Sequence, residues 1–231
     1  MLFIFFIYNQ KIKLSQHQNP LIDIRLFKIK DFNIGLVAVL FHFMLHTAYL
    51  LLSAVYLQNG LGISALDSGL YFIFPGILFI ISSVMASRLI VKFGKRVLQV
   101  GVVILMAAFY FQMTLWKPGI STWLVIGLMG AWGFGNGLVL PSLLNIALKN
   151  VPARYAGAAA GIYSTFQQTA SALGVSIIGG VFFYFSKDGW QMAYHFGILC
   201  LLICVIIVGL MLQLLPGAKT ADENVTNIIS E

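Results

Sequence analysis

The sequence predicts an all-α membrane protein built as a bundle of six transmembrane helices. Six stretches of the 231-residue chain contain no Lys, Arg, Asp or Glu, and each is at least 20 residues long. About 20 helical residues, rising 1.5 Å each, cross a hydrocarbon core of about 30 Å. Backbone groups in lipid have no water to bond, so these segments must be helical. The chain has only 9% charged residues, whereas soluble domains have about 25%.

Turn residues set the expected limits of the spans. Asn59-Gly60 ends the first span near Tyr56, Lys117-Pro118-Gly119 separates the third from the fourth, and Asn150-Val151-Pro152 ends the fourth. The predicted spans are 32–56, 68–90, 97–116, 122–148, 155–185 and 192–215. Short connections force neighbouring helices to be antiparallel, and Pro75 and Pro141 are expected to bend their helices.

The chain is expected to divide into three parts. Residues 1–31 form a cytoplasmic lead-in, residues 32–216 the six-span bundle, and residues 217–231 a cytoplasmic tail. Met1 to Tyr8 is hydrophobic but too short to span, so it is interpreted as the remnant of a preceding helix or as a segment lying at the membrane surface.

Basic residues predict the orientation of the bundle. Twelve of the fourteen fall in alternate gaps between the spans, and only Lys117 and Lys187 lie in the opposite loops. By the positive-inside rule, both termini are cytoplasmic. The net charge of +7 is thus explained by membrane topology, and no nucleic-acid partner is expected.

The first span carries a polar stripe at helical spacing. It consists of His42, His46, Tyr49, Ser53 and Tyr56. Such a face should meet other helices or a water-filled cavity, because facing lipid would be expensive. Two interpretations stay open: a cavity wall in which a histidine binds substrate or takes up a proton, or hydrogen bonds that serve packing. Two histidines supply too few ligands for a metal site, and none is expected.

Two other spans carry amide side chains that need partners in hydrocarbon. Gln167 and Gln168 lie in the fifth span, where Ser164 shares the face of Gln168, and Asn136 lies in the fourth. Substrate contact and interhelical packing are both consistent with these positions. None of the acidic residues lies well inside a span, so no buried carboxylate is available to carry protons.

Glycines predict where helix backbones approach one another. The fourth span has Gly133 and Gly137, and the fifth has Gly157 and Gly161. Pairs of small residues four positions apart let two helices come close. Close helix contacts are therefore expected at both pairs.

The loop SRLIVKFGKR, from Ser87 to Arg96, resembles the cytoplasmic-loop motif G-x-x-x-D-x-x-G-R/K-R/K of the major facilitator superfamily. Gly94, Lys95 and Arg96 match the end of that motif. Ser87 replaces its first glycine, and Val91 replaces its aspartate. The resemblance implies a loop that governs conformational change and topology.

Three further stretches are similar to the second half of the fourteen-span drug:proton antiporters of that superfamily. These are NPLIDIRLFKIKDF at 19–32, GFGNGLVLP at 133–141 and GAAAGIYSTFQQTASALG at 157–174. In that group a basic residue is frequent at the position of Gln167, and a glutamine at that of Gln168. The resemblance implies a six-helix bundle equivalent to the carboxyl half of a transporter, in which two bundles rock around a midplane site.

The functional expectation is multidrug-type efflux of small, amphipathic molecules by proton antiport in the intact protein. The substrate-binding candidates are His42, His46, Tyr49, Asn136, Gln167 and Gln168. The coupling carboxylates belong largely to the missing amino half, so this chain is expected to be inactive alone. No enzyme activity or cofactor is expected, and the expected location is the bacterial inner membrane. The alternative is a six-span scaffold or assembly subunit that pairs with a separate amino half.

Overall fold

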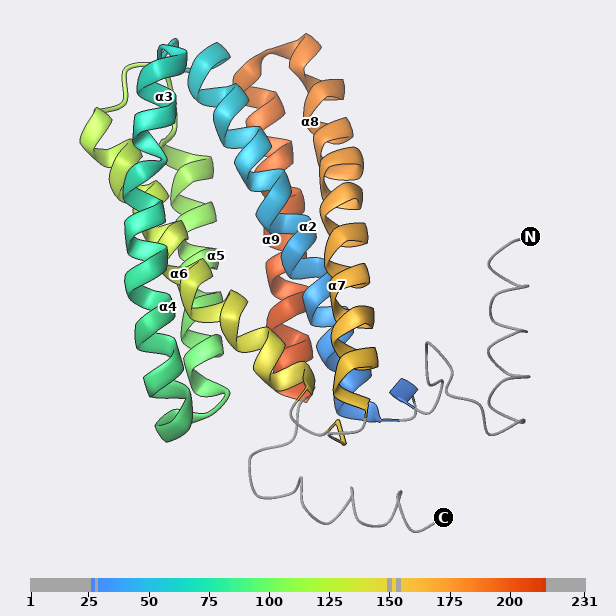
Figure 1. The fold of residues 1–231 in the computed structure, drawn as a ribbon. Coiled ribbons are helices and arrows are strands. Elements are labelled where there is room, and N and C mark those ends of the chain that lie inside the picture. The colour runs from blue at the N-terminus through green and yellow to red at the C-terminus, as the bar shows by residue number, and fades with distance from the viewer. Residues whose placement is uncertain (1–25, 28, 149–150, 153–154, 215–231) are drawn as a thin grey trace, which may run out of the picture.

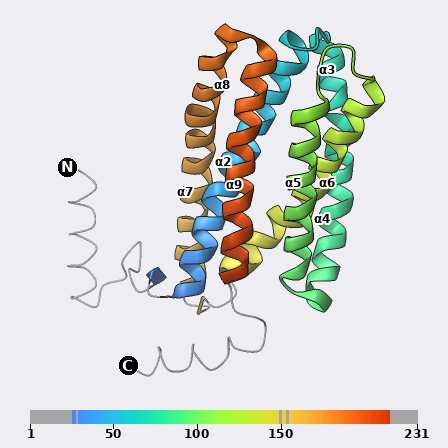
Figure 2. The same ribbon diagram turned by 180° about the vertical axis from the view of Figure 1, so that it is seen from behind.

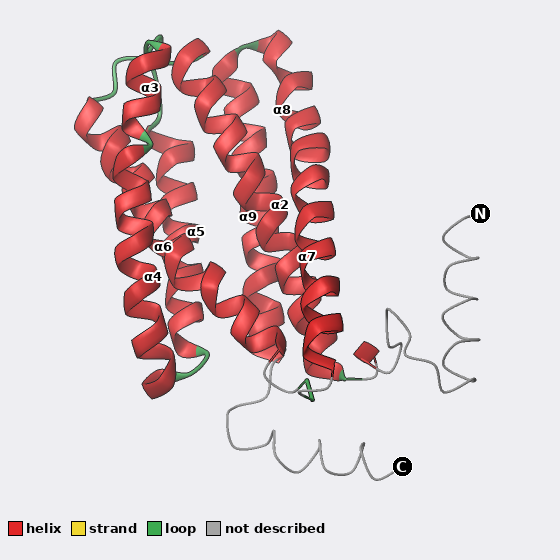
Figure 3. Cartoon of the chain, in the orientation of Figure 1, coloured by secondary structure: helices red, strands yellow, loops and turns green. Residues whose placement is uncertain are grey.

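The computed structural model describes residues 26–27, 29–148, 151–152 and 155–214. The expectations for the hydrophobic N-terminal segment and the C-terminal tail lie outside these residues. All regular structure in the described part is helical (Figure 3). The main helices are α2 (Lys30–Asn59), α3 (Ala65–Tyr71), α4 (Ile73–Phe93), α5 (Arg96–Leu115), α6 (Thr122–Leu148), α7 (Ala156–Leu173), α8 (Gly179–Phe185) and α9 (Trp190–Leu214).

The prediction of six membrane spans is confirmed. Six helical stretches are long and apolar enough to cross a membrane, and each overlaps one predicted span. Their bounds are Lys30–Asn59, Ala65–Phe93, Arg96–Leu115, Thr122–Asn145, Ala156–Asp188 and Trp190–Leu214. The first helix continues past Tyr56 to Asn59. The Gly60 N–H then donates to the Tyr56 carbonyl and caps the end of the helix.

The second span is interrupted near its start, between α3 and α4. The Ser64 side chain caps α3 by accepting a hydrogen bond from the Asp67 N–H at 3.1 Å. Pro75, in the first turn of α4, has no N–H to donate to the Tyr71 carbonyl one turn earlier. The helix therefore breaks at Phe72, as expected of a proline-bent span.

The fifth span contains a π-helical turn, η3 (Gly174–Ile178), between α7 and α8, and ends in the 3₁₀ turn η4 (Ser186–Asp188). At η3 the chain lies directly against α2. A Cβ on Gly174 would collide with the Met44 carbonyl. The Thr47 hydroxyl lies 2.8 Å from the Phe43 carbonyl and 3.2 Å from that of Ser171 on α7. These contacts join the middle of the fifth span to the first.

The helices form two groups that pack side by side. One group holds α4, α5 and α6, and the other holds α2, α7, α8 and α9 (Figure 1). The groups meet where α5 packs on α9, which lie beside each other in the reverse view (Figure 2), and where α2 packs on α6. The C-terminal end of α6 crosses toward α2, so that a Cβ on Gly35 would lie 3.0 Å from Ala147.

Glycine allows close helix contact in α6 but not in α7. A side chain on Gly133 would collide with Pro75, and one on Gly137 with Phe79 and Ser82, all on α4. The expected contact at Gly157 and Gly161 is wrong for the described part of the chain, where a Cβ at either position would meet nothing within 4 Å. Those two glycines face outward, on a side of α7 that no described helix covers.

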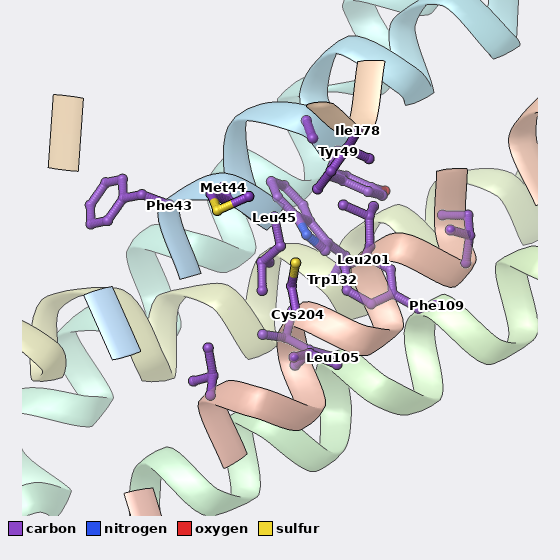
Figure 4. Packing of buried hydrophobic residues seen from close by; sticks show 14 of the residues in the cluster. Phe43, Met44, Leu45, Tyr49, Leu105, Phe109, Trp132, Ile178, Leu201 and Cys204 are labelled. Carbon is purple, nitrogen blue, oxygen red and sulfur yellow. The ribbon is translucent and has the colours of Figure 1, made fainter. Parts of the chain in front are cut away.

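The apolar core follows the meeting line of the two groups. Leu45 and Tyr49 from α2, Leu105 and Phe109 from α5, and Leu201 from α9 are all buried there (Figure 4). Core side chains thus come from both groups. This arrangement turns the polar stripe of α2 inward, toward α6 and α9.

Candidate functional site

The polar stripe of α2 faces the interior of the bundle. His42, Tyr49, Ser53 and Tyr56 are each 0% exposed, whereas His46 is only partly buried. The four-and-three spacing therefore identified a single buried face, as the sequence indicated. Burial places most of this stripe between helices of this chain. The two interpretations, a cavity wall that binds substrate and hydrogen bonds that serve packing, both stay predictions.

Asn136 of α6 bridges the two histidines of α2. His42 Nε2 lies 2.8 Å from Asn136 Oδ1, and Asn136 Nδ2 lies 2.7 Å from His46 Nδ1. Asn136 is itself 0% exposed. Three of the candidate residues thus form one hydrogen-bonded unit, the His42–Asn136–His46 bridge, across the meeting line of the two groups.

Trp132, one helical turn before Asn136, covers the bridge on one side. Its ring stacks on His46 with centroids 5.5 Å apart and on Tyr49 with centroids 4.0 Å apart. Figure 4 shows Tyr49 and Trp132 side by side in the core. The Tyr49 and Ser53 hydroxyls have no hydrogen-bond partner within the described residues. Sequence analysis missed Trp132, although its position four residues before Asn136 was a usable signal.

A second buried cluster was also missed. Tyr56 stacks on Tyr194 with centroids 4.2 Å apart, and Tyr194 stacks on Trp116 at 5.2 Å. The Tyr56 hydroxyl lies 2.8 Å from Gln191 Oε1, and the Tyr194 hydroxyl donates to Gln112 Oε1 at 2.9 Å. Gln112 and Gln191 in otherwise apolar helices were the available signal. The cluster ties α2 and α9 to α5.

Gln167 and Gln168 lie apart from the bridge, on α7. Gln168 is exposed and Gln167 is partly buried, and no hydrogen bond within the described residues joins their side chains to the histidines. The Ser171 hydroxyl donates to the Gln167 backbone carbonyl at 3.0 Å. The structure therefore brings together four of the six substrate-binding candidates, and the two glutamines lie outside that group.

The loop between α4 and α5 holds the expected conformational residues. Gly94 has a φ of +55°, a backbone conformation that side chains disfavour, and it ends α4. Lys95 follows it and donates from Nζ to the Gln213 carbonyl at 3.3 Å, in the last turn of α9. That turn contains no basic residue of its own. Lys95 therefore supplies the cation that favours a helix C-terminus, while Arg96 begins α5 and is exposed.

Metal binding has no support from the side chains that the structure describes. Within those residues, no three His, Cys, Asp or Glu side chains gather as metal ligands would. Cys200 and Cys204 are free thiols in α9. The functional groups of the bridge are two imidazoles and one amide.

The fold and the buried polar bridge define a multi-pass, all-helical membrane protein. A sequence model of the Major Facilitator Superfamily matches residues 2–175, and the chain belongs to this family, whose members are transport proteins rather than enzymes. The six-span bundle corresponds to one half of the family fold. The resemblance inferred from the loop and fifth-span motifs is thereby confirmed.

Curated relatives carry names of drug-resistance proteins. The chain is 29% identical over 161 residues to the lincomycin resistance protein LmrB of Listeria monocytogenes, covering 69% of this chain and 34% of that protein. It is 29% identical over 164 residues to the multidrug resistance protein Stp of Mycobacterium tuberculosis, covering 71% and 30%. It is 29% identical over 167 residues to the quinolone resistance protein NorB of Staphylococcus aureus, covering 71% and 36%. The matched part of the chain is about a third of the length of each of these relatives.

Proposed function

We propose that this chain is the carboxyl-terminal half of a small-molecule efflux transporter driven by proton antiport, and that it works only together with an amino-terminal half. Family membership and the drug-resistance names of its relatives support this proposal. The partner bundle is part of the same polypeptide or a separate chain. Transport would follow from the two bundles rocking around a site between them.

The outer face of α7 is the observation that carries the proposal. Gly157, Gly161, Ser164 and Gln168 follow one another at spacings of four, three and four, and all are exposed. Contact of such a face with lipid is unfavourable, because a glutamine in hydrocarbon lacks hydrogen-bond partners. Small residues such as glycine and serine also favour close packing against another helix. A second helical bundle would satisfy both requirements.

The proposed substrate site takes its residues from three helices. They are His42, His46 and Tyr49 on α2, Asn136 on α6, and Gln167 and Gln168 on α7. Only His46 and the two glutamines reach the surface of the described chain, so these would contact a substrate directly. His42, Tyr49 and Asn136 would then act from within the bundle.

The proposed orientation places both termini in the cytoplasm of a bacterium, with the bundle in its inner membrane. Arg88, Lys92, Lys95 and Arg96 all lie at the end of the bundle that holds the α4–α5 turn, which supports this orientation. Gly94, Lys95 and Arg96 would form the conformational loop on that side. Labelling of a single cysteine placed at Lys187 from outside the cell, and none at Lys92, is the expected result.

Dye efflux tests the function. Cells without their own pumps would be loaded with rhodamine 6G and would express either this chain alone or the chain with an amino-terminal half. We expect proton-dependent export only from the pair. Robust export by the chain alone would refute the half-transporter proposal. A stable complex with the amino half that exports nothing would favour the scaffold function instead.

A matched pair of variants tests the α7 face. Gln168→Leu should weaken association with the amino half, because it removes a polar group from the proposed interface. Leu210→Ile, at an exposed apolar position of α9, should leave association unchanged. The measurement is co-purification of a tagged amino half, and equal recovery with both variants would count against this face.

A further inference from the structure

His46 is the one member of the bridge with a polar atom that reaches the surface. His42 and Asn136 are 0% exposed, and His42 Nδ1 is fully buried without a hydrogen-bond partner in the described part. The His46 side chain is partly exposed, and its Nε2 makes no hydrogen bond among the described residues. Unlike His42 Nδ1, the Nε2 atom of His46 is not fully buried. The accessible end of the bridge is therefore His46 Nε2.

The bridge determines which nitrogen of His46 carries hydrogen. Asn136 Oδ1 can only accept, so His42 Nε2 donates to it. Asn136 Nδ2 can only donate, so His46 Nδ1 presents its lone pair. A neutral imidazole that accepts at Nδ1 holds its hydrogen on Nε2. His46 Nε2 is consequently an N–H donor that points away from Asn136.

Two neighbours keep this donor in place. The Trp132 ring, 4% exposed, stacks on the His46 ring at an interplanar angle of 17° and restricts its rotation. The second neighbour is Asn136, whose amide in this orientation hydrogen-bonds both histidines and so holds the His46 ring through Nδ1. The bridge thus runs in one direction, from His42 through Asn136 to His46.

We propose that His46 Nε2–H donates a hydrogen bond to the transported molecule, and that Asn136 and His42 are positioning residues that set its tautomer. This inference rests on the proposed transport function for its ligand. The matching ligand class is a molecule with an uncharged acceptor oxygen, such as a carbonyl, ether or hydroxyl. Asn136 and His42 touch no ligand, and they act only through His46.

The tautomer is measurable without any ligand. Nitrogen NMR of the full chain, labelled with ¹⁵N-histidine and held in lipid nanodiscs, should show His46 with hydrogen on Nε2 and a lone pair on Nδ1. The Nε2–H of His46 should exchange with water, whereas that of His42 should be protected. Hydrogen on Nδ1 of His46, or protection of its Nε2–H, would overturn the proposal in the wild-type chain itself.

Asn136→Asp tests the positioning role at nearly unchanged size. A carboxylate cannot donate, so His46 Nδ1 would become the donor. The nitrogen spectrum should then show the hydrogen of His46 on Nδ1 and the lone pair on Nε2. The exposed His195 on α9 supplies the control and should not change. An unaltered His46 tautomer in a folded Asn136→Asp chain would show that Asn136 does not set it.

Transport variants test the contact with the ligand. In the assembled transporter, His46→Gln retains an N–H donor and should keep the KM for rhodamine 6G near that of the wild type. His46→Leu removes the donor and should raise the KM roughly 3- to 10-fold, as expected for one hydrogen bond. An unchanged KM in His46→Leu would refute the ligand contact. Absence of export from the assembled wild type would instead count against the proposed function, and the NMR results would then decide this inference.

Discussion

Replacing Gly174 by alanine should destabilise the bundle, whereas the same change at Gly180 should not. Both glycines lie in the fifth span, and alanine generally favours a helix by about 0.5–1 kcal/mol over glycine. A Cβ on Gly180 would meet nothing within 4 Å, so Gly180→Ala should realise that gain. A Cβ on Gly174 would collide with the Met44 backbone, which α2 holds in place and which cannot rotate aside.

The cost at Gly174 follows from overpacking. Forcing one extra methyl group into a packed site costs about 1–3 kcal/mol, and a clash with backbone belongs at the upper end of that range. The two variants should therefore differ by about 3 kcal/mol in free energy of unfolding. The Thr47 hydrogen bond to Ser171 should weaken as α2 and α7 separate, which adds to the difference.

Reversible unfolding in mixed detergent micelles, followed by helical circular dichroism, measures that difference. Both variants would be purified in the same detergent and compared with the wild type. Equal stability of Gly174→Ala and Gly180→Ala would refute the reasoning, because it would mean that the close approach of η3 to α2 is absent in the protein.

Three further substitutions have expected outcomes. Tyr194→Phe should destabilise the bundle by about 1–3 kcal/mol in the same unfolding assay, because it leaves Gln112 Oε1 buried and unpaired. Tyr56→Phe should cost about 0.5–1.5 kcal/mol, because one partner of its hydroxyl, Gln191, is exposed and the other, the Trp116 carbonyl, still accepts from Gln191 Nε2 at 2.9 Å. Equal costs would contradict this ranking. Lys95→Met should loosen the last turn of α9 by about 0.3–1 kcal/mol, seen as faster backbone hydrogen exchange around Gln213, and unchanged exchange there would argue against the cap.

The spans and the buried face of α2 were predictable, because both depend on local properties of the chain. Charge-free length defines a span, and the four-and-three spacing from His42 to Tyr56 defines a face. The partner of that face was not predictable. Asn136 meets the histidines only because α6 crosses α2 at one rotation and depth, and these are set by many contacts at once.

Glycine illustrates the same limit. Gly133 and Gly157 each begin a pair spaced by four residues, yet among the described residues only the first pair meets another helix. A small residue permits close approach of a helix but does not determine which helix packs there. Gln168 likewise needs a partner in hydrocarbon, and the sequence could not say that the described helices leave its side chain exposed.

The bonds of α2 also determine when the protein can be completed during synthesis. His42 finds its partner 94 residues later in the chain, and Tyr56 finds Gln191 135 residues later. At about 5–20 residues per second, the ribosome needs roughly 7–27 s to make that second segment. The first span therefore gains its partners in stages: the Trp116 carbonyl becomes available to Tyr56 60 residues later, Asn136 comes with α6, and Gln191 comes only with α9. A nascent chain cut off before α9 would therefore lack the Gln191 partner of Tyr56.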